Sequence, residues 1–223
     1  MSNQDSSNTT KKSTVYVALI TALAIIVGSV ILGLGGQTTT PEATPEAAPA
    51  VDLPNAGITE SNKATISLTT NQGEIVIETT PSLAPLTVNA ITALAQKNYF
   101  DKTICHRLTT EGIYVLQCGD PTGTGTGGPG FNIPDENLPQ PIDNNYPAGT
   151  VAMANSGLPG TSGSQFFLVY QDTSLGPDYT IWGSITSGLD ILQTIASAGV
   201  VDGGADGAPL TGVTIESTKV TIS

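Results

Sequence analysis

An uncharged run of 20 residues, from Val15 to Leu34, constrains the chain more than any other feature. At the rise of an α-helix, a run of this length crosses the hydrocarbon core of a bilayer. It has no polar face, which a helix buried in a globular core would show. The sequence therefore predicts a transmembrane anchor over residues 15–34. Lys11 and Lys12 place residues 1–14 in the cytoplasm, so the rest of the chain is expected on the extracytoplasmic side of the cell membrane.

A cleaved signal peptide is the alternative interpretation of the same run. A charged start followed by an apolar stretch is common to both kinds of segment, but the apolar region of a signal peptide is shorter, about 7 to 15 residues. The Ala-x-Ala candidate for cleavage, Ala48-Pro49-Ala50, lies well downstream of the run. We therefore favour an uncleaved anchor.

Residues 35–62 have the composition of a linker. They contain Pro41, Pro45, Pro49 and Pro54, and the unit Thr-Pro-Glu-Ala occurs twice. Proline at this density disfavours helix and sheet and favours an extended chain. The sequence predicts a solvated stalk between the anchor and a folded domain.

The remaining residues, 63–223, are long enough for one domain with its own core. Apolar and polar residues alternate over 64–69 and again over 74–78, with a glycine turn between them, which is typical of paired strands. Helical spacing is found at 85–97 and 188–196. Further strand-like segments are 104–108, 113–118, 149–154, 165–170, 180–185 and 213–222. Spacing alone predicts a closed or sandwich-like β domain with two helices.

Composition excludes several classes of function. The chain carries 7 Lys+Arg against 19 Asp+Glu, a formal net charge of −12, so we expect no nucleic-acid partner. The glycine-rich segment Gly119–Gly130 does not continue into Gly-Lys-Ser/Thr, which argues against a phosphate-binding loop. One histidine and two cysteines offer neither a hydrolytic triad nor a metal cluster, and we expect no metal or other cofactor.

Four short motifs follow one another within 63 residues of sequence, and they point to a binding groove. Cys105-His106-Arg107 and Gln117-Cys118-Gly119-Asp120 contribute one arginine and one glutamine on a hairpin. Met153-Ala154-Asn155 and Gly163-Ser164-Gln165-Phe166-Phe167 contribute small residues, amides and two aromatic rings. Arg107 is the only arginine of the chain. Together the motifs predict a shallow apolar groove with one fixed cation.

In their order and content these motifs resemble the cyclophilin-type peptidyl-prolyl cis-trans isomerases, in particular a bacterial, membrane-anchored member. The resemblance covers residues 64–223. It implies a mainly β fold, a closed eight-stranded antiparallel barrel capped by two helices. It also implies isomerisation of X-Pro bonds without a cofactor, with proline-containing peptides and unfolded exported proteins as partners. We expect the domain to be monomeric.

The resemblance also assigns roles to individual residues. Arg107 is expected to donate a hydrogen bond to the twisted prolyl amide, and Gln117 to hold Arg107 or the substrate backbone. Phe166 and Phe167 must point to opposite faces of their strand, so only one of them can enter the barrel. The same alternation turns His106 away from the face of Arg107, which indicates a structural role. The substrate-binding residues are then Tyr114, Val115, Ala154, Asn155, Gln165, Phe167, Leu175 and Tyr179.

Several positions depart from the family's pattern and support a rival function. Between Arg107 and Gln117 there are two more residues than usual. Tyr114 and Val115 stand where the family usually has phenylalanine and methionine, Ser174 replaces a groove tryptophan, and Tyr179 replaces a pocket histidine. These four replacements favour a catalytically weak peptide-binding or scaffold module on the same fold. Arg107 favours the enzyme.

Two cysteines in an exported domain suggest one disulfide, between Cys105 and Cys118. Strand alternation raises an objection: if Arg107 and Gln117 share a face, Cys105 shares it too, while Cys118 points away. A β-bulge in the long hairpin would remove the conflict.

Overall fold

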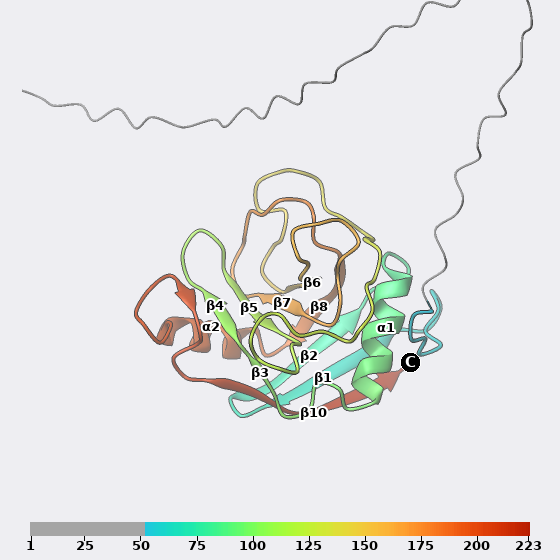
Figure 1. The fold of residues 1–223 in the computed structure, drawn as a ribbon, viewed down its shortest axis with the longest axis horizontal. Helices are drawn as coiled ribbons and strands as arrows, with labels where there is room; N and C mark the ends of the chain where they lie inside the picture. The colour runs from blue at the N-terminus through green and yellow to red at the C-terminus, as the bar shows by residue number, and fades with distance from the viewer. Residues whose placement is uncertain (1–51) are drawn as a thin grey trace, which may run out of the picture. The chain divides into compact units, whose positions relative to one another are not determined.

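The computed structural model describes residues 52–223, which form a β-rich domain with two helices (Figure 1). The predicted anchor at 15–34, the segment 1–14 and most of the linker 35–62 lie outside the described residues, so these assignments stay predictions. None of the helices in the described part has the length and apolar character needed to span a bilayer.

In the described residues ten strands form one sheet, in the order β3-β10-β1-β2-β8-β6-β7-β5-β4-β9, and all neighbours are antiparallel. The predicted β-rich class with two helices is confirmed. The strands are β1 (Ala64–Thr70), β2 (Gly73–Thr79), β3 (Thr103–Cys105), β4 (Arg107–Thr109), β5 (Val115–Cys118), β6 (Thr150–Met153), β7 (Phe166–Val169), β8 (Ile181–Ser187), β9 (Asp206–Gly207) and β10 (Val213–Ile222).

The expected eight strands become ten for two reasons. The segment predicted as one strand at 104–108 is interrupted at His106, which leaves β3 paired with β10 and β4 paired with β5. The two-residue strand β9 pairs with β4 and gave no pattern long enough to recognise.

The expected closed ladder is also absent among the described strands, because the sheet has two edges, β3 and β9. The sheet curls until β3 lies beside β5, and there the disulfide Cys105–Cys118 joins the two strands. The interruption at His106 lets Cys105 turn toward Cys118 while Arg107 still faces Gln117. The interruption at His106 therefore removes the conflict seen in the sequence, and the β4–β5 pairing shows none of the register shift that a β-bulge would cause.

Helix α1 (Pro85–Gln96) and helix α2 (Leu189–Ala198) lie on opposite sides of the strands (Figure 1). Pro85 fits the first turn of α1, where its missing N–H is not needed. The first turn is capped from a distant loop: the Glu136 carboxylate accepts hydrogen bonds from the N–H groups of Leu86 and Thr87, at 3.0 and 2.8 Å. A negative charge at this end also suits the helix dipole.

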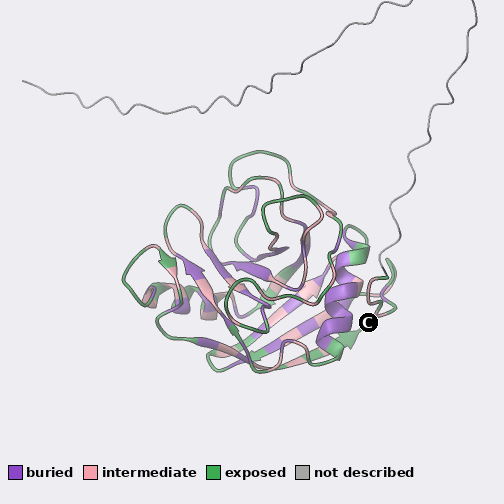
Figure 2. Ribbon diagram, viewed as in Figure 1, coloured by how far each residue is buried: buried purple, intermediate pink, exposed green. Residues whose placement is uncertain are grey.

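Two apolar clusters occupy the two faces of the curled sheet, and buried residues continue from the central strands into α1 (Figure 2). The larger cluster is the main core on one face of the sheet, and it includes Phe100, Phe166 and Trp182. The smaller cluster lies on the other face and includes Val115, Phe167 and Tyr146, with Leu175 and Tyr179 packed against it. Phe166 and Phe167 thus point to opposite faces, as strand alternation requires.

Candidate active site

The β4–β5 hairpin places the arginine and the glutamine side by side. Arg107 and Gln117 are direct partners in the antiparallel register, so their side chains emerge on the same face. Arg107 Nη1 donates a hydrogen bond to Gln117 Oε1 at 3.3 Å. The guanidinium is therefore oriented by the partner that the sequence predicted.

A second, unpredicted partner of Arg107 is Asp206 in β9. Arg107 Nε donates to Asp206 Oδ1 at 2.8 Å, and Arg107 Nη2 donates to Asp206 Oδ2 at 2.7 Å. This bidentate hydrogen bonding raises the pKa of Arg107 and lowers the pKa of Asp206. Asp206 lies in a glycine-rich connection after α2, and nothing in the local pattern indicated that it returns to the hairpin.

A cavity of about 160 Å³ opens beside Arg107. Strands β5 and β7 supply its apolar wall with Val115 and Phe167, and the segment after β7 supplies Leu175 and Tyr179. This volume is well below that of pockets for drug-sized ligands, about 300–1,000 Å³. It suits a small apolar group. The lining residues are Arg107, Ile113, Val115, Gln117, Ala154, Asn155, Phe167, Leu175 and Tyr179.

Tyr114 is a correction to the predicted site, because it does not line this cavity. Side chains alternate along a strand, so Ile113, Val115 and Gln117 share one face and Tyr114 lies on the other. The Tyr114 ring instead packs edge-to-face on Tyr170, with centroids 5.9 Å apart. Ile113, which the sequence interpretation missed, contributes to the cavity wall. Alternation from Gln117 would have identified it.

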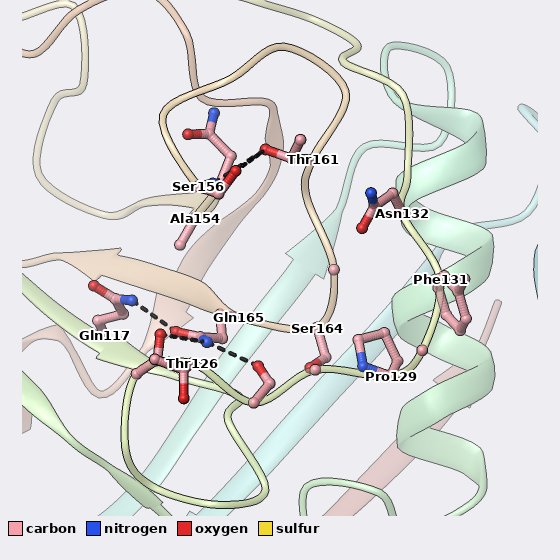
Figure 3. Close-up of a pocket in the computed structure, with 16 residues that line it drawn as sticks. Gln117, Thr126, Pro129, Phe131, Asn132, Ala154, Ser156, Thr161, Ser164 and Gln165 are labelled. Carbon is pink, nitrogen blue, oxygen red and sulfur yellow. Dashed lines mark hydrogen bonds between the residues drawn. The ribbon is translucent and has the colours of Figure 1, made fainter.

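A larger cavity of about 710 Å³ adjoins the smaller one, and Gln117, Ala154 and Asn155 line both. Figure 3 shows Gln117 and Gln165 pointing toward each other beneath it. Gln117 Nε2 donates to Gln165 Oε1 at 2.8 Å, and Gln165 Nε2 donates to the carbonyls of Gly125 and Gly127, at 3.0 and 2.9 Å. Gln165 therefore connects the arginine's partner to the glycine-rich segment, and it borders the larger cavity only.

Asp120 holds the glycine-rich segment from inside. Its buried carboxylate accepts main-chain N–H groups from Thr122, Thr124, Gly125 and Gly127, at 2.7, 3.1, 2.6 and 3.0 Å. Burial alone would raise the pKa of Asp120, but hydrogen bonds from the Thr122 hydroxyl and from the N–H groups of Gly127, Thr122 and Gly125 outweigh it and lower the pKa well below the ordinary value. Gly127 is required here, because a Cβ would lie 2.1 Å from Asp120 Oδ1.

Ala154 and Asn155 follow the end of β6 and form the border between the two cavities. The Ala154 N–H donates to the Gln165 carbonyl at 2.9 Å. The Asn155 side chain donates to the Asp178 carbonyl at 2.8 Å and accepts from the Gly157 N–H at 2.9 Å. These bonds fix the main chain at the border, where the resemblance placed the path of a bound peptide.

His106 lies outside both cavities, as strand alternation suggested. Its buried ring nitrogens have no hydrogen-bond partner within residues 52–223, and a Cβ built on Gly125 would lie 3.6 Å from the ring. Desolvation lowers the pKa of His106, and the nearby Arg107 acts in the same direction against Asp120. The ring therefore stays neutral near pH 7 and packs under the glycine-rich segment.

Taken together, the described residues offer a donor, an apolar hollow and a rigid border. In the described part of the chain, no three His, Cys, Asp or Glu residues gather in a way that could hold a metal ion. The arrangement can bind a short extended segment, seat one small apolar side chain, and direct a charged N–H group at the segment's backbone.

Comparisons with known proteins agree with this geometry. Residues 65–220 match the family model described as cyclophilin type peptidyl-prolyl cis-trans isomerase/CLD. The chain is 45% identical over 199 residues to the probable peptidyl-prolyl cis-trans isomerase B of Mycobacterium tuberculosis, covering 82% of this chain and 64% of the relative. The corresponding protein of Mycobacterium leprae is 45% identical over 202 residues, covering 84% and 68%. The match thus spans about two thirds of the length of these relatives.

Solved structures are similar too. A cyclophilin type peptidyl-prolyl cis-trans isomerase of Cryptosporidium parvum superposes with a TM-score of 0.62 at 29% identity, covering 71% of this chain and 98% of that chain. The structure of the same protein in the presence of the dipeptide Ala-Pro gives a TM-score of 0.61 at 30% identity, covering 70% and 98%.

Proposed function

The chain belongs to the cyclophilin-type peptidyl-prolyl cis-trans isomerase family, and on that basis we propose that it isomerises X-Pro bonds by rotation of the amide assisted by Arg107. The substrate's proline ring would occupy the smaller cavity. The peptide on either side of it would follow the border at Ala154 and Asn155 into the larger cavity.

The chemistry needs no covalent step. Rotation of an X-Pro amide out of plane faces a barrier of about 18–20 kcal/mol, because the nitrogen loses its resonance with the carbonyl. The twisted nitrogen is a better hydrogen-bond acceptor than the planar one. A donor aimed at it stabilises the transition state more than the ground state, and lowering the barrier by about 7 kcal/mol gives roughly a 10⁵-fold acceleration.

One observation carries the proposal: Arg107 lies at the edge of a cavity of about 160 Å³ that has one apolar wall, and it is held on two sides by Asp206 and Gln117. An arginine is always charged, and its donors have a fixed geometry. Val115 and Phe167 form an apolar wall beside it, and a substrate seated against this wall would displace water from the donor. Such preorganised donors act most strongly where water is excluded.

We further propose that the substrates are exported proteins and that the domain acts outside the cytoplasm, as a single-pass membrane protein. Two observations support this. The uncharged run 15–34 is long enough to span a bilayer, and Cys105 and Cys118 form a disulfide, which is typical of oxidising compartments.

The test is a prolyl-peptide isomerisation assay on the full chain. We expect Arg107→Ala to lower kcat/KM by about 100- to 1,000-fold, since one transition-state donor is lost. Lys102→Ala is the matched control, because it removes a cation whose ion pair with Glu216 is exposed and outside the cavity lining. Equal rates for wild type and Arg107→Ala would contradict the proposal.

A catalytically weak peptide-binding module is the second candidate. It is favoured by the engagement of Arg107 with Asp206, which occupies one side of the guanidinium. The same assay separates the two: a chain that binds a proline peptide by calorimetry but gives no rate above background would be the binding module.

A further inference from the structure

Within residues 52–223, Asp206 is the one charged group that forms an ion pair with Arg107, and backbone pairing of its strand places it there. Strand β9 pairs with β4 in the register Thr109↔Asp206 and Leu108↔Gly207. The Thr110 N–H donates to the Ala205 carbonyl at 2.8 Å, which fixes the residue next to Asp206 as well. The main chain at Asp206 is therefore fixed next to β4, and this places its carboxylate within reach of Arg107.

The pairing leaves a defined part of the guanidinium free. An arginine side chain has five N–H donors in a planar fork. Asp206 takes one on Nε and one on Nη2, and Gln117 takes one on Nη1. Two N–H groups then remain, one on each Nη nitrogen. The guanidinium is restrained at both ends and cannot turn its fork without breaking three hydrogen bonds.

We propose that Asp206 is a positioning residue for the reaction: it holds the Arg107 guanidinium so that the remaining Nη donors face the substrate in the smaller cavity. This inference rests on the proposed function. Both partners are substantially exposed, with side chains 40% and 54% accessible, so solvent screens their attraction and limits what the pair adds to folding stability. A two-residue strand nevertheless places Asp206 beside Arg107. We infer that the pair serves to orient the guanidinium at the site.

The expected effect follows from the sensitivity of rate to placement. A displacement of about 1 Å at a reacting group can cost roughly 100-fold in rate. Asp206→Asn keeps the shape of the side chain but loses the charge and one acceptor oxygen. Position 206 can then accept only one, weaker hydrogen bond from the guanidinium. We expect kcat to fall by about 10-fold, because the donor is still present but less well placed, with KM changed by less than about 2-fold.

The experiment measures kcat and KM for wild type, Asp206→Asn, Asp206→Ala, Asp206→Glu and the double variant Arg107→Ala with Asp206→Ala. Glu78→Gln is the matched control, since it neutralises a carboxylate in an exposed ion pair of the same length, 2.7 Å, with Lys63. We expect Asp206→Glu to recover most of the rate and Glu78→Gln to leave it unchanged. The double variant should be no slower than Arg107→Ala alone, because the two residues act as one unit.

A second readout does not depend on activity. Arg107 is the only arginine of the chain, so a ¹⁵N spectrum contains one arginine Nε signal. We expect this N–H to be protected from exchange with water in wild type and in Glu78→Gln, and exposed in Asp206→Ala, which has no side-chain acceptor. An unchanged exchange rate in Asp206→Ala would overturn the positioning role even if the chain proved not to be an isomerase.

Three kinetic results would also overturn it. Asp206→Asn with wild-type kcat would show that Gln117 alone positions the donor, and a raised kcat would show that Asp206 withholds Arg107 from the substrate. A double variant clearly slower than Arg107→Ala would show that Asp206 acts independently of the arginine. By contrast, a wild-type chain without activity, but with a protected Nε signal, would count against the proposed function only.

Discussion

Strands β1, β2 and β10 have seven, seven and ten residues and pair along almost their whole length, whereas β4, β5, β6 and β7 have only three or four each. The first group, the ladder half, packs beneath α1 and contains ordinary alternating strands. The second group, the groove half, carries both cavities. There, side chains that hydrogen-bond to other side chains and to main-chain groups replace the missing ladder bonds, as at Asp120, Gln117 and Gln165.

The positively charged residues are also distributed unequally between the two halves. The lysines of the described part are Lys63, Lys97, Lys102 and Lys219, all in or near the ladder half, and no lysine or arginine occurs between Leu108 and Thr218. Arg107, the first residue of β4, is thus the one cation in the strands of the groove half. The comparison indicates that apolar burial in the ladder half contributes chiefly to stability, while polar side chains of the groove half set the geometry of the site, so some substitutions should change one without the other.

The largest expected effect tests the ladder half. Ile77 in β2 is fully buried in the main core, so Ile77→Ala should lower the free energy of unfolding by about 2–5 kcal/mol. Urea unfolding measures this, and the folded variant should keep its kcat/KM. Leu175→Ala is the counterpart in the groove half: being half-buried, it should cost less stability but reduce kcat/KM by enlarging the smaller cavity. If Ile77→Ala mainly reduced kcat/KM and Leu175→Ala mainly reduced stability, the proposed difference between the two halves would be wrong.

The disulfide is expected to have the next largest effect. Cys105 and Cys118 are 13 residues apart, and closing a loop of about that size stabilises a fold by about 3 kcal/mol. Changing both cysteines to serine should therefore lower the free energy of unfolding by about this amount, and reducing the wild type should have the same effect in urea. If reductant left the wild-type unfolding midpoint unchanged, the bond would not contribute as the loop argument requires.

A smaller effect is expected at Asp120. Asp120→Asn replaces one acceptor oxygen by an NH₂ group, which leaves N–H donors of the glycine-rich segment without a partner at a cost of about 1–3 kcal/mol. Hydrogen exchange should speed up at the Gly125 and Gly127 amides. Asp101→Asn is the control from the ladder half, where the carboxylate accepts from Thr218 instead. Exchange at Gly125 and Gly127 should be the same in that control as in wild type.

The pH dependence of stability gives the same residue a second test. The pKa of Asp120 is lowered from its ordinary value of 3.8 in the folded chain, so its contribution is fully present above pH 3.8 and is lost as pH falls through the lower folded pKa. Asp120→Asn should make the acid unfolding curve shallower in that range. A curve as steep as that of wild type would argue that other carboxylates dominate.

His106 should give the smallest effect. Its pKa is lowered from 6.5 by burial, so the unfolded chain takes up the proton first, and stability declines as pH falls from 6.5 toward the folded pKa. Because His106 is the only histidine, one imidazole signal in an NMR titration reports the folded pKa directly. A midpoint above 6.5 would show that Asp120 controls the ring after all.

The ladder half was predictable from the sequence, and the groove half only in part. Alternation identified the strands at 64–69, 74–78 and 213–222 because one face of each is buried. Arg107, Gln117, Val115 and Phe167 were found through motifs. Tyr114 was assigned to the cavity by its position in the motif. The alternation of side chains along the strand places it on the opposite face. Asp206 could not be found, because a two-residue strand has no periodicity and its partner lies 99 residues away.

The glycine-rich segment of the groove half has a consequence for ligands other than peptides. Loops of this composition often cradle a phosphate, because successive main-chain N–H groups converge on a concave site. Here four such N–H groups already converge on the Asp120 carboxylate, so the anion in this concave site is a side chain of the protein itself. Inorganic phosphate would have to displace the Asp120 carboxylate from these N–H groups. We therefore expect the segment to serve as a rigid wall of the cavity and not to bind phosphate.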